Sequence, residues 1–127
     1  MADDLALLLA ANKGFYRAFA GRDVAAMAQL WAVRAPVACV HPGWPALSGR
    51  DAVLTAWQQI LSNPASPRVR CPKEQVFLYG EVGFVICQEL LEQGMLVATN
   101  VFVREDAAWL MVHHQASPLA AVALEFD

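Results

Sequence analysis

Three histidines and one glutamate are the residues of this sequence that are best suited to moving a proton. His41 follows an apolar stretch and precedes Pro42, so we expect it at the rim of a pocket. A histidine with an ordinary pKa of about 6.5 could act there as a general base; alternatively, it bonds the backbone and only shapes the turn. Glu89 lies in an apolar, strand-like stretch, which predicts a pocket or a dimer interface, preferably beside a histidine or Asn100. An exposed strand edge is the alternative for Glu89.

His113 and His114 are adjacent in a predicted strand, so their side chains should point to opposite faces of the sheet. One should face the cavity and the other the outer surface, where a partner subunit could lie. Strict alternation groups Trp109, Met111, His113 and Gln115 on one face and Leu110, Val112, His114 and Ala116 on the other. Because a zinc site needs three or four convergent ligands, we predict no metal. Neither a glycine-rich phosphate loop nor a nucleophile elbow is present, so we also predict no cofactor.

Several aromatic and amide side chains could surround a bound molecule. Asn12 and Tyr16 lie on the apolar stripe of a predicted helix, so each is either a core residue bonded to the backbone or a hydrogen-bonding group in the cavity. Trp44 could cover an apolar ligand or plug the cavity mouth. The complete set of predicted ligand-binding residues is Asn12, Tyr16, Phe19, Trp31, Trp44, Trp57 and Asn100.

The first half of the chain has helical periodicity. Apolar residues at helical spacing predict a helix over Asp4–Ala20, and a short second helix begins after Asp23. A third helix should follow the histidine turn, because Ser48 and Asp51 have the spacing of a helix cap. The residues 63–67 contain two prolines and must form a loop.

The second half has a period of two, which predicts a sheet. Short turns separate four predicted strands, so we expect an antiparallel meander that curls under its own twist. The helices must cover its concave face, because their apolar stripes need a partner. The prediction is one α+β domain over residues 1–127, shaped as a cone with an opening at one end. The predicted strands are Val37–Val40, Arg68–Tyr79, Val82–Glu92, Met95–Arg104 and Ala108–Ala116.

Composition limits the classes of partner. Hydrophobic residues make up 57% and charged residues 17%, an apolar excess that a cavity or an oligomer interface would absorb. The net charge is −3 and no basic run is present, so we predict no nucleic-acid partner. Two aspartates precede a first apolar run that is too short to cross a bilayer, which predicts neither a signal peptide nor membrane association. Three widely spaced cysteines favour free thiols in a reducing cytoplasm.

The order of elements and several short motifs resemble one known group of proteins. The motifs are Asn12…Phe15-Tyr16, Asp23…Met27…Leu30-Trp31, Val40-His41-Pro42-Gly43, Gly49-Arg50…Val53…Trp57 and Trp109…His113-His114…Ser117-Pro118. Together they resemble the SnoaL-like branch of the NTF2-like superfamily over nearly the whole chain. The resemblance implies a cystatin-like cone with three N-terminal helices on a strongly curved antiparallel sheet, commonly a homodimer through the outer sheet face.

The same resemblance implies several functions, because this superfamily hosts isomerases, cyclases, dehydratases, binding modules and association domains. Tyr16 is near the place of the oxyanion-donating tyrosine of ketosteroid isomerases, but we find no acidic residue at the places of their base and second donor. We therefore expect a domain that binds a small, largely apolar molecule. Acid/base chemistry would involve His41 with His113 or His114. The alternatives are a homodimeric association module without catalysis, or an isomerase- or cyclase-type enzyme.

Overall fold

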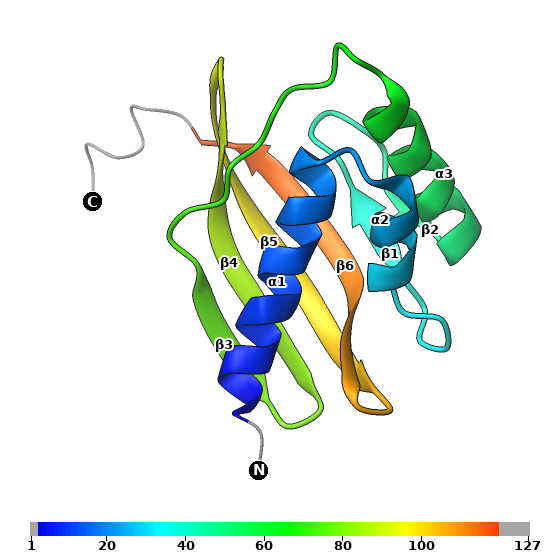
Figure 1. The fold of residues 1–127 in the computed structure, drawn as a ribbon, viewed down its shortest axis with the longest axis vertical. Coiled ribbons are helices and arrows are strands. Elements are labelled where there is room, and N and C mark those ends of the chain that lie inside the picture. Colours follow the sequence, from blue (N-terminus) through cyan, green and yellow to red (C-terminus); the bar gives the residue numbers. More distant parts are fainter. Residues whose placement is uncertain (1–2, 120–127) are drawn as a thin grey trace.

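The computed structural model describes residues 3–119, which form three helices and a six-stranded sheet (Figure 1). The helices lie on one side of the curved sheet, so the predicted α+β architecture is confirmed. No helix in the described range is long and apolar enough to cross a membrane. In chain order the elements are α1 (Asp4–Ala20), α2 (Val24–Leu30), β1 (Ala38–Val40), β2 (Leu47–Ser48), α3 (Arg50–Ser62), β3 (Gln75–Tyr79), β4 (Val82–Leu91), β5 (Gly94–Glu105) and β6 (Ala108–Pro118).

The first two helices begin at aspartate caps. The Asp3 side chain accepts hydrogen bonds from the N–H groups of Leu5 and Ala6, and the Asp23 side chain accepts one from Ala26. These contacts satisfy N–H groups that have no partner within the helix. The predicted bounds of α1 and the predicted cap of α2 are confirmed.

The predicted cap of α3 is wrong. Ser48 lies in β2, where it is paired with Ala38, and α3 is preceded by Gly49 with no side-chain cap. Gly49 has φ +92°, a conformation that residues with a Cβ rarely adopt, and its N–H donates to the carbonyl of Val37. The chain therefore enters α3 through a glycine turn that is bonded to the sheet.

The sheet has the strand order β2-β1-β6-β5-β4-β3. Strands β3 to β6 form the predicted antiparallel meander, while β1 pairs in parallel with β6 and β2 extends that edge. The predicted strand Arg68–Tyr79 is too long, because only Gln75–Tyr79 is strand. Pro72 has no N–H to donate and Lys73 has φ +58°, so the preceding segment is not strand. It contacts β4 through a bridge between Arg70 and Leu90 and through the Pro72 carbonyl, which accepts from the Gln88 N–H.

A β-bulge in β6 changes which side chains share a face. Val101 is opposite His113, but Phe102 is opposite Met111, so the residue between them on β6 has no partner. The predicted strict alternation is therefore wrong. Trp109, Met111, His114 and Ala116 share the buried inner face, which meets the helices, and Leu110, Val112, His113 and Gln115 lie on the outer face.

Helix α1 crosses the inner face of the sheet (Figure 1). It packs tightly against β4 at Gly83, where a Cβ atom would collide with the Leu8 side chain. The buried core between helices and sheet includes large aromatic side chains, among them Phe15, Trp31 and Phe102.

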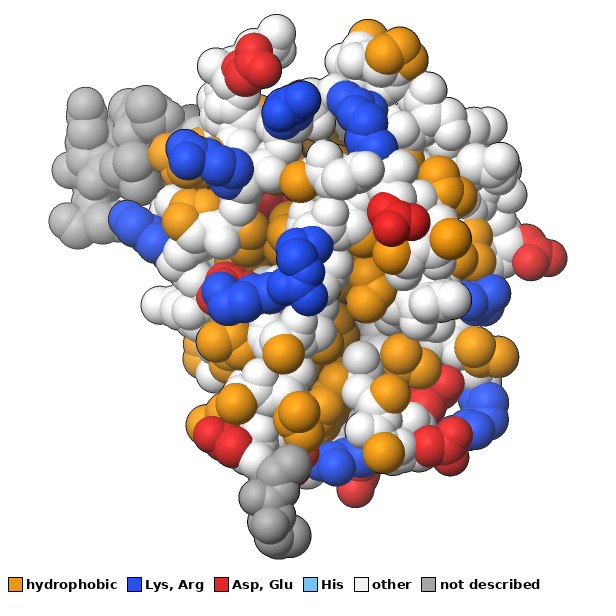
Figure 2. Space-filling view, viewed as in Figure 1, with side chains coloured by type: hydrophobic (Ala, Val, Ile, Leu, Met, Phe, Trp, Pro, Cys, Tyr) orange, Lys and Arg blue, Asp and Glu red, His pale blue; other side chains and the backbone are white. Residues whose placement is uncertain are grey.

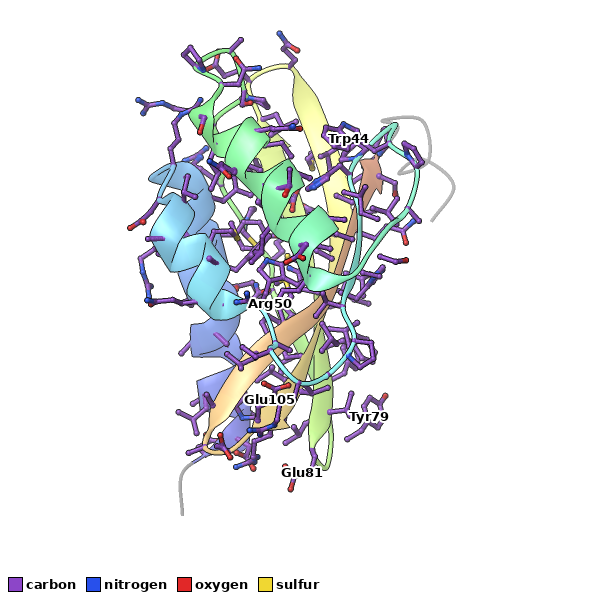
Figure 3. The ribbon with its side chains drawn as sticks, turned by 90° about the vertical axis from the view of Figure 1, so that its right-hand side faces the viewer. Trp44, Arg50, Tyr79, Glu81 and Glu105 are labelled. Carbon is purple, nitrogen blue, oxygen red and sulfur yellow. The ribbon has the colours of Figure 1, made fainter. Side chains whose placement is uncertain are left out.

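The connection from α2 to β1 is held by two charged side chains, labelled in Figure 3. The Glu105 carboxylate accepts hydrogen bonds from all three N–H groups of residues 33–35, at 2.8 to 3.2 Å. The Arg50 guanidinium donates to the carbonyl oxygens of Ala28 and Ala32. These contacts hold the connection from α2 to β1 in place, and Glu105 lies at the end of the sheet far from the Trp44 loop.

Candidate functional site

A cavity of about 430 Å³ lies between the C-terminal ends of α1 and α3 and the loop from β1 to β2. The C-terminal end of β4 and the N-terminal end of β5 also contribute to its wall. Its size is within the range of small-molecule sites. Trp44, at the loop in Figure 3, is 40% exposed. The apolar part of the wall consists of Phe19, Pro42, Trp44, Ile60, Pro67, Leu91 and Leu96, and the polar part consists of His41, Gln59, Asn63, Ser66 and Glu89.

Positive charge lies outside this cavity. None of the described lysine and arginine residues lines it, whereas Arg22, Arg68 and Arg70 line neighbouring pockets that share Leu91 with it. Figure 2 shows lysine and arginine side chains spread over the surface that carries α1. A negatively charged ligand would therefore meet cationic side chains on the surface but none within the cavity.

Glu89 is the acidic group of the cavity wall. It is 2% exposed, and its Oε2 accepts a hydrogen bond of 2.6 Å from the Tyr16 hydroxyl. Burial raises the pKa of Glu89, and the Tyr16 hydrogen bond offsets part of that rise. Burial and the nearby Glu89 also raise the pKa of Tyr16, so the phenol keeps its proton. Glu89 is therefore a carboxyl group that stays protonated to a higher pH than an exposed glutamate.

A buried chain of side chains extends from Tyr16. The amide nitrogen of Asn100 donates to the Tyr16 oxygen at 3.1 Å and to Asn12 Oδ1 at 2.9 Å. His114 Nδ1 lies 2.5 Å from Asn100 Oδ1. At the other end, Asn12 Nδ2 donates to Glu74 Oε2 at 2.6 Å.

His114 is the histidine on the inner face. It is 1% exposed, and its Nε2 lies 3.8 Å from Glu89 Oε2, which is too long for a hydrogen bond. Burial lowers the pKa of His114 to about 3, and the nearby His41 and His113 contribute to the decrease. His114 is therefore neutral at physiological pH, and it stands beside Glu89 as the sequence suggested. His113 is on the outer face, with Nδ1 3.1 Å from the carbonyl oxygen of Ala38.

His41 is the second titratable group of the cavity wall. Its ring packs edge-on against Trp44 and Trp57, at centroid distances of 5.0 and 4.8 Å. Burial lowers its pKa to about 4, so the imidazole is neutral and can accept a proton or a hydrogen bond. Its carbonyl oxygen accepts from the Trp44 N–H, so His41 also shapes the turn. Both interpretations made from the sequence fit this geometry.

The structure places the predicted site residues in four locations. Phe19, His41, Trp44 and Glu89 line the cavity. A buried layer that does not line it contains Asn12, Tyr16, Trp57, Asn100 and His114. Trp31, at the end of α2 and bridged to Met111, is in the core, and His113 is outside.

Sequence reasoning missed Glu74 of the buried chain and eight residues of the cavity wall, namely Pro42, Gln59, Ile60, Asn63, Ser66, Pro67, Leu91 and Leu96. Leu91 is two residues after Glu89 on the same strand, so alternation could have identified it. Ile60 and Leu96 gave no signal of their own. Glu74 was missed because the segment before β3 was predicted as part of a strand, in which Glu74 gave no signal of its own.

The described residues offer no grouping of three histidine, cysteine or acidic side chains that could hold a metal ion. The three cysteines are free thiols: Cys39 and Cys87 are buried, and Cys71 is half-buried. The chemistry available at the cavity is therefore that of a carboxyl group with a raised pKa and a neutral imidazole.

Comparison with known proteins identifies the domain. A family described as the SnoaL-like domain matches residues 8–121. The F-box protein SKIP8 of Arabidopsis thaliana is 26% identical over 112 residues, which are 87% of this chain and 48% of that protein. The chain thus spans about half the length of this curated relative.

Two solved structures share about a third of their residues with this chain. A candidate dehydratase of the NTF2-like family from Streptomyces avermitilis is 33% identical, with a TM-score of 0.85, over 93% of this chain and 97% of that one. A candidate calcium/calmodulin-dependent protein kinase type II association domain from Thiobacillus denitrificans is 34% identical, with a TM-score of 0.78, over 87% and 94%. Their folds agree with the cone that the sequence predicted.

Proposed function

This chain belongs to the SnoaL-like family, and we propose that it binds a small, uncharged, largely apolar molecule in the cavity beside Glu89. The observation that carries this proposal is the wall of the cavity, in which aromatic and aliphatic side chains surround one buried carboxyl group. Apolar burial supplies the binding energy, and a few placed polar groups supply the orientation.

The charge of the ligand follows from the groups in the wall. An anion would find no lysine or arginine there and would lie beside a carboxyl group. A protonated Glu89 instead matches a carbonyl or hydroxyl oxygen, which accepts a hydrogen bond. Oε2 is occupied by Tyr16, so Oε1 is the oxygen available to the ligand.

We further infer acid/base chemistry from the pair Glu89 and His41. A carboxyl group with a raised pKa keeps its proton to a higher pH and can donate it, and a neutral imidazole can accept one. The description of the Streptomyces avermitilis protein as a candidate dehydratase supports this direction, because dehydration requires one group to protonate the leaving hydroxyl and another to take a proton.

The test is a set of three probes with one aromatic skeleton, carrying a methyl ketone, a carboxylate or an ammonium group. We expect the ketone to bind, observed by saturation-transfer NMR, and the carboxylate to fail. Leu96→Trp should fill the cavity and abolish binding, whereas Val97→Trp on the outer face is the matched control and should retain it. Equal binding of all three probes, or binding that survives Leu96→Trp, would refute the proposal.

A second candidate function is self-association through the outer sheet face. Phe77 and Phe84 stack there at 4.7 Å, and Tyr79, labelled in Figure 3, is 63% exposed beside them. The description of the Thiobacillus denitrificans protein as a candidate association domain supports self-association. The two functions are compatible, because the cavity and the outer face are on opposite sides of the sheet.

Light scattering tests this second candidate. We expect a dimer at micromolar concentration and a monomer for Phe84→Arg. Val24→Arg changes an exposed apolar residue on α2 and should leave the dimer intact. A monomeric wild-type protein would exclude the association module.

A further inference from the structure

We propose that Asn12 and Asn100, anchored on Glu74, are positioning residues that hold His114 in the tautomer protonated at Nδ1, with the Nε2 lone pair directed at Glu89. The inference rests on the proposed role of Glu89, because its consequence is to keep a proton on that carboxyl group. The hydrogen bonds that link the side chains from Glu74 to His114 run in one order of donors and acceptors, and the orientation of each group determines that of the next.

The first step is at the edge of the helix layer. Glu74 Oε1 pairs with Lys13 Nζ at 2.8 Å, and Oε2 lies 2.6 Å from the amide of Asn12. A carboxylate can only accept hydrogen bonds, so Asn12 must turn its NH₂ group toward Glu74. The carbonyl oxygen of Asn12 then points the opposite way, into the core.

The second step transfers this orientation to Asn100. The group that meets Asn12 Oδ1 must be a donor, so it is the Asn100 NH₂ group, at 2.9 Å. The same NH₂ group donates to Tyr16, whose own proton is directed at Glu89. Both contacts therefore turn the carbonyl oxygen of Asn100 toward His114.

The third step fixes the imidazole. Asn100 Oδ1 is an acceptor only, so His114 Nδ1, 2.5 Å away, must carry a proton. Nε2 of the neutral ring is then an unprotonated acceptor, 3.8 Å from Glu89 Oε2. A lone pair facing an ionised carboxylate is repulsive, so this tautomer favours the protonated form of Glu89.

Burial makes this relay, the hydrogen-bonded side chains of Glu74, Asn12, Asn100 and His114, effective. Asn12 and Asn100 are fully buried and His114 is nearly so, which leaves little opportunity for water to replace a missing partner. The titratable groups near His114 and Glu89 include Tyr16 on α1, Cys39 and His41 on and beside β1, Cys87 on β4, and His113 on β6. None of them donates to His114 Nε2.

The first test uses the unmodified protein, so it does not depend on the folding of a variant. Long-range ¹H–¹⁵N correlation spectra of the imidazole rings should show His114 protonated at Nδ1 and unprotonated at Nε2 at neutral pH. Finding His114 protonated at Nε2, or as an imidazolium, would overturn the proposal. This spectrum requires no ligand, so it separates the relay from the proposed function: failure of every ketone probe would refute ligand binding and leave the tautomer result standing.

Variants then test the relay itself. Asn100→Leu removes the acceptor, and the proton of His114 should move to Nε2, exchanging the protonated and unprotonated nitrogen signals of the ring. Glu74→Met should produce a second population with that exchanged pattern, because Asn12 can then turn.

Lys13→Met breaks the same ion pair without touching the relay and should change nothing. The outer-face His113 is the internal control. A folded Asn100→Leu or Glu74→Met protein with His114 still only in the Nδ1–H form would refute the relay.

Discussion

Glu89 and Glu105 are two buried glutamates near opposite ends of the same sheet, and their surroundings shift their pKa values in opposite directions. Glu105 is 9% exposed and accepts hydrogen bonds from the N–H groups of residues 33–35. These donors, the Ala35 N–H above all, lower the pKa of Glu105. Glu89 is 2% exposed and receives one hydroxyl donor within an apolar wall, so burial raises its pKa.

The difference teaches which buried acid is structural. Glu105 lies where three N–H groups of a turn converge, and its charge completes their hydrogen bonding. Glu89 lies where few donors reach it and where a cavity adjoins it, so its charged form is disfavoured and its proton is available. The same side chain thus holds a turn at one end of the sheet and offers a proton at the other.

The largest effect should come from Glu105→Gln. The amide has a single acceptor oxygen for three N–H groups, and its NH₂ group faces donors, so the protein should lose stability at neutral pH. The lowered pKa of Glu105 means that its charge stabilises the fold above the ordinary glutamate pKa of about 4.3, and that this contribution is lost as the pH falls through the folded-state value. Urea unfolding across this range should therefore show a deficit that shrinks in acid.

A control distinguishes the turn from general surface charge. Glu81→Gln alters an exposed glutamate that pairs with Arg104 and should change stability little. If Glu105→Gln were as stable as Glu81→Gln at neutral pH, the turn would not depend on the carboxylate, and the comparison between the two ends of the sheet would fail.

The next effect should come from Tyr16→Phe, which removes the hydroxyl that donates to Glu89. The loss of a buried hydrogen bond should cost about 1–2 kcal/mol of unfolding free energy. The same change should raise the pKa of Glu89 further, because the Tyr16 donor now lowers it. A double-mutant cycle with Glu89→Leu, which removes the acceptor, should give a coupling of at least about 0.5 kcal/mol by urea unfolding. Additive effects would show that the two groups act independently.

Sequence periodicity was sufficient for the fold but not for the details of pairing. The bounds of α1 and the meander follow from local patterns, because helical and strand periods are properties of neighbouring residues. The parallel pairing of β1 with β6 and the bulge in β6 depend on distant strands, so alternation assigned Trp109 and Met111 to the face of His113.

The site was predictable by residue type but not by arrangement. His41 and Trp44 were candidates for the cavity because they follow an apolar stretch, and Glu89 was a candidate because it lies within one. Asn12 and Asn100 are 88 positions apart, and only the packed core shows that their amides meet. Glu74 enters that chain because Pro72 and Lys73 bend the segment before β3, a local feature without periodicity.

The smallest effect on stability, and the one that most sharply tests the contrast, should come from Glu89→Gln. Gln has nearly the same shape and still accepts from Tyr16, so little changes in acid, where Glu89 is protonated. The folded state holds the Glu89 proton to a higher pH than the unfolded state does, so wild-type stability falls as the pH rises from about 4.3 through the raised folded-state pKa. The Gln variant does not titrate there and should become relatively more stable over that window.

Glu89→Gln and Glu105→Gln should thus shift the difference from wild-type stability in opposite directions as the pH rises. Paired urea unfolding curves in acid and at neutral pH measure both slopes with one assay. A Glu89→Gln protein that loses stability toward neutral pH would mean that Glu89 is stabilised as a carboxylate. Glu89 would then resemble Glu105, and its role as a proton donor to a bound molecule would have to be abandoned.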